Sequence, residues 1–117
     1  MYICDTQALD AVLPALEAAD VLAIDTEFMR ERTYYARLCL LQIATAEDVF
    51  LIDTIALEGE LGRLAKVLAA PGTVKVFHAG SQDIEVLYRA TGVTPAPVFD
   101  TQVAATLAGF PTQVGYA

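Results

Sequence analysis

A short apolar run that ends in two acidic residues constrains this chain more than any other feature. Residues 21–24 (Val-Leu-Ala-Ile) demand burial, and Asp25, Thr26 and Glu27 follow them directly. Side chains alternate between the two faces of a strand, so Asp25 and Glu27 would stand on one face. Two adjacent carboxylates at the edge of a core repel each other and lose hydration. Positions 21–29 contain no Lys or Arg to compensate, which favours a divalent cation; the alternative is a solvated face.

The rest of the chain predicts an α/β domain built on a mixed sheet. We expect strands at residues 21–27, 38–45, 48–53, 73–77 and 98–99, and helices at 7–19, 58–69, 81–91 and from Asp100 to about Ala108. The first helix should be capped by Thr6 and interrupted at Pro14. The helix at 81–91 should turn Tyr88 inward and end at Gly92. Tight joins between the first three strands favour an antiparallel meander. The alternating helices and strands that follow favour helices on both faces, a layout that resembles the ribonuclease H-like fold.

Composition narrows the class of protein. The 117 residues suffice for one domain, and the net charge of −8 argues against a broad, nonspecific grip on nucleic-acid backbone. No apolar run approaches the roughly 20 residues that span a bilayer, and no signal peptide is evident, so we expect a cytoplasmic protein without a membrane partner. Hydrophobic residues make up 56%, which favours a surface covered by a partner subunit or by more of the same polypeptide. Cys4 and Cys39 are expected to be reduced core thiols.

A basic and aromatic segment follows the acidic pair. The stretch RERTYYAR, residues 30–37, contains Arg30, Arg32 and Arg37 with Tyr34 and Tyr35 among them. Basic residues interleaved with aromatic ones suit phosphates and stacked bases. The alternative is a solvated loop whose tyrosines pack on the core.

A second acidic position, Asp83, falls in the first turn of the helix at 81–91, after a strand expected to lie beside strand 21–27. An acid there also complements the helix dipole, which is a sufficient structural reason for it. Gly80 suits a tight turn between strand and helix. His78 is either a proton carrier or a hydrogen-bonded structural histidine, and an N-cap role suffices for Asp100.

Three segments, VLAIDTEFMRERTYYARLCLLQI, HAGSQDIEVL and VFDTQVAATL, together resemble ribonuclease D, a family of DEDD-type 3′–5′ exoribonucleases in the subgroup with a catalytic tyrosine. The resemblance implies that Asp25 and Glu27 form the first motif and Asp83 the second, as ligands of two Mg²⁺ or Mn²⁺ ions. It implies RNA with a single-stranded 3′ end, such as a tRNA precursor, as substrate. The implied substrate-binding residues are Thr26, Phe28, Arg32, Tyr34, Tyr35 and His78, with core packing as the alternative for Phe28.

The chain departs from the family pattern in its third motif, Tyr-x-x-x-Asp. Tyr88 is followed four places later by Gly92, and Tyr116 is next to the last residue. The family's HRDC-type region is not found either. We therefore expect residues 1–117 to be an N-terminal part of the catalytic domain, a poor nuclease alone and prone to self-association. One alternative is a non-catalytic module of the same fold. The other is a haloacid-dehalogenase-like phosphatase with Asp25 as nucleophile, although such phosphatases normally have an Asp-x-Asp motif and a parallel sheet.

Overall fold

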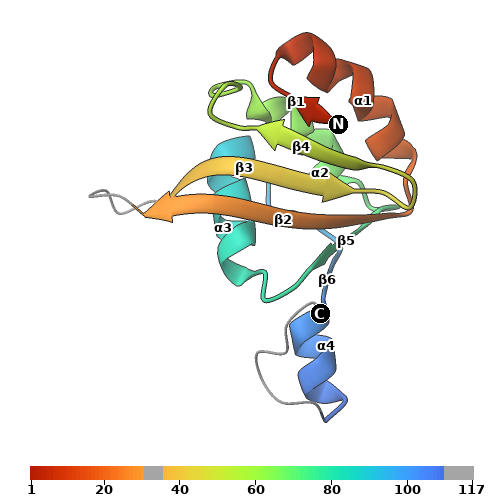
Figure 1. The fold of residues 1–117 in the computed structure, drawn as a ribbon. Helices are drawn as coiled ribbons and strands as arrows, with labels where there is room; N and C mark the ends of the chain where they lie inside the picture. The colour runs from red at the N-terminus through yellow and green to blue at the C-terminus, as the bar shows by residue number, and fades with distance from the viewer. Residues whose placement is uncertain (31–35, 110–117) are drawn as a thin grey trace.

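The computed structural model describes residues 1–30 and 36–109 (Figure 1). Arg32, Tyr34 and Tyr35 lie outside the described residues. The strands are β1 (Tyr2–Ile3), β2 (Val21–Arg30), β3 (Ala36–Ala44), β4 (Val49–Asp53), β5 (Val74–Phe77) and β6 (Val98–Asp100). The helices are α1 (Thr6–Ala18), the 3₁₀ turn η1 (Leu61–Leu64), α2 (Ala65–Ala69), α3 (Ser81–Thr91) and α4 (Thr101–Leu107).

The described strands form one mixed sheet in the order β1-β4-β3-β2-β5-β6. β2, β3 and β4 make the antiparallel meander that the tight joins predict. β5 pairs in parallel with the other edge of β2, and β6 pairs in parallel with β5. The short β1, which the sequence pattern did not predict, pairs in parallel with β4. The strand at 73–77 therefore lies beside the strand that carries Asp25, as expected.

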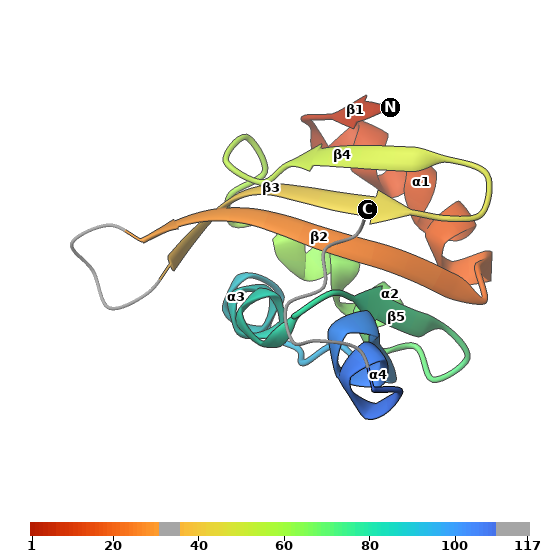
Figure 2. The same cartoon turned by 60° about the horizontal axis from the view of Figure 1, so that its bottom comes forward.

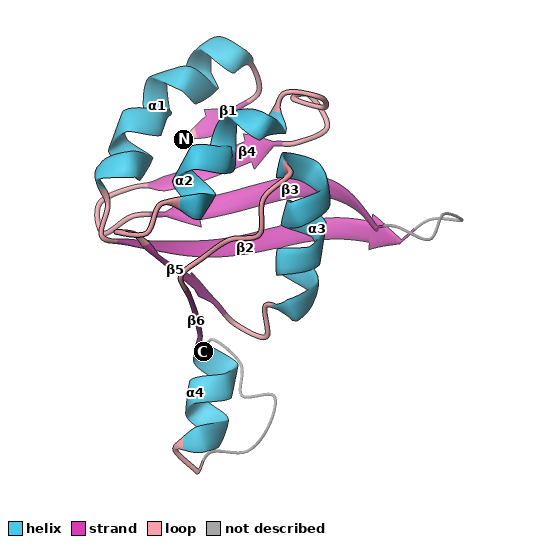
Figure 3. Cartoon of the chain, turned by 180° about the vertical axis from the view of Figure 1, so that it is seen from behind, coloured by secondary structure: helices cyan, strands magenta, loops and turns pink. Residues whose placement is uncertain are grey.

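The helices α1, α2 and α3 all lie on one face of this sheet, as the view from behind makes clear (Figure 3). Leu22 and Ile24 of β2 are buried on that side, whereas Val21 is 51% exposed on the other. α4 extends away from the sheet and buries none of its side chains (Figure 2). The prediction of helices on both faces is thus wrong for the described residues. β4, β5 and the first half of β2 alternate between buried and accessible residues, as in a sheet with one face covered by helices.

We call the uncovered side of the sheet the open face. Strand pairing assigns to it these residues: Tyr2, Val21, Ala23, Asp25, Glu27, Leu40, Gln42, Ala44, Val49, Leu51, Asp53, Val74, Val76 and Phe99. It is therefore largely apolar. Asp25 and Glu27 stand together on β2, and a third acid, Asp53, lies at the end of β4 and accepts a hydrogen bond from the Tyr2 hydroxyl.

Several local predictions need correction. Asp5, not Thr6, caps α1: its backbone is extended and its Oδ1 accepts a hydrogen bond from the Ala8 amide at 2.7 Å. α1 also continues through Pro14 to Ala18. The helix expected at 58–69 begins only at Leu61, with a 3₁₀ turn. Tyr88 is 49% exposed, because the buried side of α3 is set by Asp83, Val86 and Leu87.

The cysteines are not core thiols: Cys4 is exposed and Cys39 half-buried. None of the helices in residues 1–30 and 36–109 has the length and apolar character needed to cross a membrane.

Candidate active site

β2 carries the acidic pair to the point where its pairing with β5 has ended. The last β2–β5 pair joins Ala23 to Val76, so Asp25 begins the part of β2 that extends past β5. Asp25 is half-buried and Glu27 exposed, while Thr26 between them is 7% exposed. Asp25 and Glu27 thus share the open face, as strand alternation predicts, and Thr26 points to the helical side.

A β-bulge lies directly beside Glu27. Glu27 pairs with Leu40 of β3, but Phe28 pairs with Leu38, which leaves Cys39 as the extra residue. Bulges bend a strand and re-aim its side chains, and they occur often next to active sites. Phe28 is half-buried and packs against the hydrophobic core. Its ring also lies 6.0 Å from the Arg30 guanidinium, so core packing accounts for only part of this side chain.

Asp83 reaches β2 from the first turn of α3. Its side chain is 8% exposed and accepts a hydrogen bond from the Thr26 hydroxyl. Burial raises the pKa of Asp83 above its ordinary value; the bond from Thr26 opposes this, and the negative charges of Asp25, Asp100 and Glu27 add to it. The two acidic motifs are therefore close enough to interact, although 57 residues separate Thr26 from Asp83.

The turn between β5 and α3 fixes where α3 begins. Ala79 has a φ of +52°, in the left-handed region that residues other than glycine rarely adopt. A Cβ added at Gly80 would collide with Phe77 and come within 2.8 Å of its Cγ. Gly80 is therefore required by close packing rather than by a positive φ.

The last residue of β6, Asp100, and the first residue of α4, Thr101, hold this turn. The Asp100 carboxylate accepts hydrogen bonds from the amides of Ala79 and Gly80, and Thr101 Oγ1 lies 2.7 Å from His78 Nδ1. Burial alone would raise the pKa of Asp100, but the backbone donors around its carboxylate outweigh burial and hold that pKa below its ordinary value. His78 fits the hydrogen-bonded structural alternative. The sequence predicted Asp100 only as a cap, since its contact with the turn depends on the pairing of β5 with β6.

The carboxylates of Asp25, Glu27 and Asp83 are the type of ligand that a hard cation prefers. Carboxylate oxygens are the ligands that Mg²⁺ prefers. Burial is the main reason that the pKa of Asp83 is raised, and the nearby negative charges, which a cation would offset, add to it. However, no three His, Cys, Asp or Glu side chains within the described ranges lie close enough together to hold one ion. Asp83 is bonded to Thr26 on the helical side of β2, whereas Asp25 and Glu27 stand on the open face. The structure brings these three carboxylates to one stretch of β2 without gathering them around one point.

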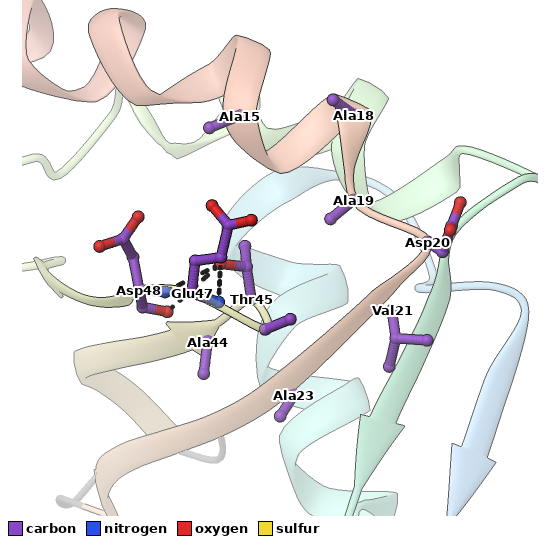
Figure 4. Close-up of a pocket in the computed structure, with 11 residues that line it drawn as sticks. Ala15, Ala18, Ala19, Asp20, Val21, Ala23, Ala44, Thr45, Glu47 and Asp48 are labelled. Atoms are coloured by element: carbon purple, nitrogen blue, oxygen red, sulfur yellow. Dashed lines mark hydrogen bonds between the residues drawn. The ribbon is translucent and has the colours of Figure 1, made fainter.

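Hollows on the open face offer no phosphate-binding chemistry. One of about 280 Å³ lies beside Asp25, lined by Gln42 and Val76 among others. A neighbouring hollow of about 600 Å³ lies where α1 ends and β2 begins (Figure 4). Its charged lining residues, Asp20, Glu47 and Asp48, are all acidic. These acids would repel phosphate, so we assign no function to it.

A third hollow has the opposite character. It measures about 390 Å³ and is lined by parts of β3, α3 and the segment after β4, including Arg37, Glu58 and Arg89. Arg37 and Glu58 form an exposed ion pair at 3.6 Å. The two arginines give this hollow a net positive lining in a chain whose net charge is −8.

Comparison with known proteins assigns the chain to a family. A family model described as 3′-5′ exonuclease matches residues 1–117. Ribonuclease D of Acidiphilium cryptum is 50% identical over 111 residues, which cover 95% of this chain and 28% of that protein. The crystal structure of Escherichia coli RNase D, described as an exoribonuclease involved in structured RNA processing, superposes with a TM-score of 0.92 at 38% identity. It matches 100% of this chain, which corresponds to 31% of the E. coli chain.

A further relative was solved with a metal ion. Brucella melitensis NrnC with bound Mg²⁺ is 34% identical, with a TM-score of 0.66 over 78% of this chain and 46% of that chain. The antiparallel pairing of β2 with β3 also argues against the phosphatase alternative, which would want a parallel sheet. This chain spans less than a third of the length of the curated ribonuclease D proteins that it matches. By its matched length and its fold, the chain belongs to the 3′-5′ exonuclease family and is similar to ribonuclease D.

Proposed function

We propose that this chain contributes the first two acidic motifs of a ribonuclease D-type 3′–5′ exoribonuclease, as part of a larger catalytic domain. The observation that carries the proposal is the buried carboxylate of Asp83 against β2, where Asp25 and Glu27 stand. A carboxylate that served only as a helix-dipole partner would be exposed to solvent, as Glu85 of the same helix is. Burying it among like charges costs stability, which is typical of functional sites.

Asp25, Glu27 and Asp83 are the residues that would hold Mg²⁺ or Mn²⁺. Cations bound there would supply an activated water and stabilise the charge that develops on the leaving 3′ oxygen. The Thr26 hydroxyl donates a hydrogen bond to the Asp83 carboxylate and so helps to hold it against β2. The bound Mg²⁺ of Brucella melitensis NrnC supports a divalent cation for this chain.

The proposed substrate is RNA with a single-stranded 3′ end. Arg37 and Arg89 line a positively charged hollow that suits a phosphate backbone. Phe28, with Arg30 over its ring, offers an aromatic face next to the acidic pair. Arg32, Tyr34 and Tyr35 lie between these groups in sequence and complete the proposed contact region with His78. More specifically, we propose that the substrate is a tRNA precursor and that the protein acts in the cytoplasm, and the resemblance to ribonuclease D supports this.

The rival proposal is a non-catalytic module of the same fold. It is favoured by one observation on the described residues: Asp25, Glu27 and Asp83 do not gather around one point. The third motif of the family, Tyr-x-x-x-Asp, is also not found in residues 84–117. Two-metal hydrolysis needs every positioned group, and loss of one typically costs about 10²–10⁴ in rate. We therefore expect residues 1–117 alone to degrade a labelled RNA far more slowly than a protein extended through that motif. Equal Mn²⁺-dependent activity in both would contradict this expectation.

A melting experiment tests the metal assignment without requiring activity. A ligand at a hundredfold excess over its Kd stabilises the folded state by about 2.7 kcal/mol, so Mn²⁺ should raise the Tm of the wild-type chain. Asp25→Asn should abolish that rise. Asp20→Asn is the matched control, because it makes the same charge change at an exposed residue just before β2. A full Mn²⁺-dependent rise in Asp25→Asn would show that the site is wrongly assigned.

A further inference from the structure

The carboxylate of Asp100 makes more contacts than a helix cap requires. Its oxygens accept hydrogen bonds from the amides of Gln102 at 2.9 Å and Val103 at 3.4 Å, which is the ordinary capping pattern for α4. They also accept bonds from the amides of Ala79 at 3.0 Å and Gly80 at 2.8 Å. The second pair joins the end of β6 to a turn about 20 residues earlier in the chain.

Thr101 holds the same turn from the adjacent position. Its hydroxyl contacts His78 Nδ1 at 2.7 Å and donates to the Phe77 carbonyl at 3.3 Å. Asp100 and Thr101 together therefore contact four consecutive residues, 77–80. We call this pair the Asp-Thr clamp. The turn needs such support, because Ala79 has a positive φ that is unfavourable without a compensating partner.

The turn at residues 77–80 also fixes the position of Asp83. The Gly80 carbonyl accepts the hydrogen bond of the Ile84 amide at 2.9 Å, which begins the backbone ladder of α3. Asp83 lies within this first turn and is held against β2 by Thr26. A displacement of the turn would move Asp83 relative to Asp25 and Glu27, which are fixed separately by the pairing of β2 with β3.

We infer that Asp100 and Thr101 are positioning residues, which hold the 77–80 turn so that α3 presents Asp83 at the right depth beside the acidic pair on β2. The inference rests on the proposed function, because the placement of Asp83 matters to the chemistry only if Asp83 is a metal ligand. Asp100 itself need not touch the metal or the substrate. Groups that orient a metal ligand from behind typically change metal affinity by about 10–100-fold when replaced.

The first measurement needs no metal. Amide hydrogen exchange of the Ile84 amide reports the first turn of α3, and the Gly92 amide, bonded to the Tyr88 carbonyl at 2.8 Å, reports its far end. Asp100→Asn and Asp100→Glu should each speed exchange at Ile84 by about tenfold or more and leave Gly92 unchanged. Asp5→Asn is the matched control, since Asp5 also caps a helix with its side chain but lies at α1. If neither Asp100 variant changes Ile84, the clamp does not hold α3.

The second measurement is Mn²⁺ affinity by titration, at a temperature where every variant is folded by circular dichroism. Both Asp100 variants should weaken Mn²⁺ binding by about 10–100-fold, and Asp5→Asn should leave it unchanged. Asp100→Glu separates geometry from charge, because it keeps the charge but displaces the carboxylate by one methylene. Wild-type affinity in Asp100→Glu would overturn the inference in favour of a purely electrostatic effect. Thr101→Val, which removes only the hydroxyl contacts, carries the same test if the Asp100 variants do not fold.

Failure of the proposed function has a different signature. If Mn²⁺ does not bind the wild-type chain, or binds Asp25→Asn equally well, the metal assignment fails whatever the Asp100 variants do. Faster exchange at Ile84 with unchanged Mn²⁺ affinity, in a chain whose binding depends on Asp25, would overturn the clamp as a positioning device and leave the proposed function intact.

Discussion

Position 80 shows how a single residue sets the geometry of the candidate site. The Gly80 amide donates to Asp100 and its carbonyl accepts from Ile84, and a Cβ added at this position would collide with the Phe77 side chain. No side chain fits there without moving either the ring or the start of α3. The sequence predicted a tight turn at this glycine, but only the structure identifies Phe77 as the reason.

We predict that Gly80→Ala destabilises the fold by about 1–3 kcal/mol, the usual cost of forcing extra volume into a packed site. The lost stability should appear as a lower denaturation midpoint in urea with an unchanged m-value. Gly72→Ala is the control: it has no atom within 4 Å of the added Cβ and no positive φ. It should be neutral. Equal losses in both variants would mean that Phe77 and the turn adapt freely.

At the level of elements, a buried lysine joins β5 to two other segments. The Lys75 side chain is completely buried, and its Nζ donates to the carbonyls of Ala70 at 2.6 Å and Ala96 at 2.8 Å. Ala70 caps the end of α2, where a positive charge is favourable. Ala96 belongs to the segment that leads into β6. Lys75 therefore ties together the elements on which the Asp-Thr clamp is built.

We predict that Lys75→Met lowers the free energy of unfolding by about 1–3 kcal/mol near neutral pH, because hydrogen bonds to a charged group are lost. Burial lowers the pKa of Lys75 in the folded state below the ordinary 10.5. Between those two values the unfolded chain binds more protons, so stability contributed by this residue rises with pH. Urea unfolding should show the difference between wild type and Lys75→Met growing as the pH increases towards 10.5. If the stability difference between wild type and Lys75→Met became smaller as the pH rose, the predicted direction of the pH dependence would be wrong.

The elements differ in how far the sequence determines them. α3 was predicted with its bounds, because Gly92 with a φ of +87° ends it in the manner expected of a C-capping glycine. The buried side of α3 was predicted incorrectly at Tyr88, since an amphipathic residue gives no clear preference. Asp5 and Thr6 are both good caps, and only the backbone conformation decides between them. The alternation on β2 predicted the shared face of Asp25 and Glu27. It could not predict that Thr26 would bond Asp83, because that contact depends on tertiary packing.

On the scale of the whole molecule, the described chain is a sheet with one covered face and one open face (Figure 3). Several apolar side chains of the open face are accessible: Val21 51%, Val49 47%, Val74 36% and Phe99 50%. Exposed apolar surface of this kind marks a contact region when it is contiguous. Val21 and Val74 are direct neighbours across the β2–β5 pairing, so part of the surface is contiguous.

We predict that the 117-residue chain self-associates through this face as its concentration rises. Burying one valine side chain is worth roughly 1.5–3 kcal/mol, and 1.4 kcal/mol corresponds to about tenfold in Kd. The double variant Val21→Thr, Val74→Thr keeps β-branched residues in both strands and should weaken association by at least about tenfold in sedimentation equilibrium. Ile55→Thr is the control, because Ile55 is 47% exposed but lies in the turn after β4. Association that resists the double variant and yields to Ile55→Thr would move the contact away from the open face. A second copy of the chain would then leave the acidic pair on β2 uncovered. Association through Val21 and Val74, in contrast, brings the second copy onto the face that carries Asp25 and should slow the access of RNA to Asp25.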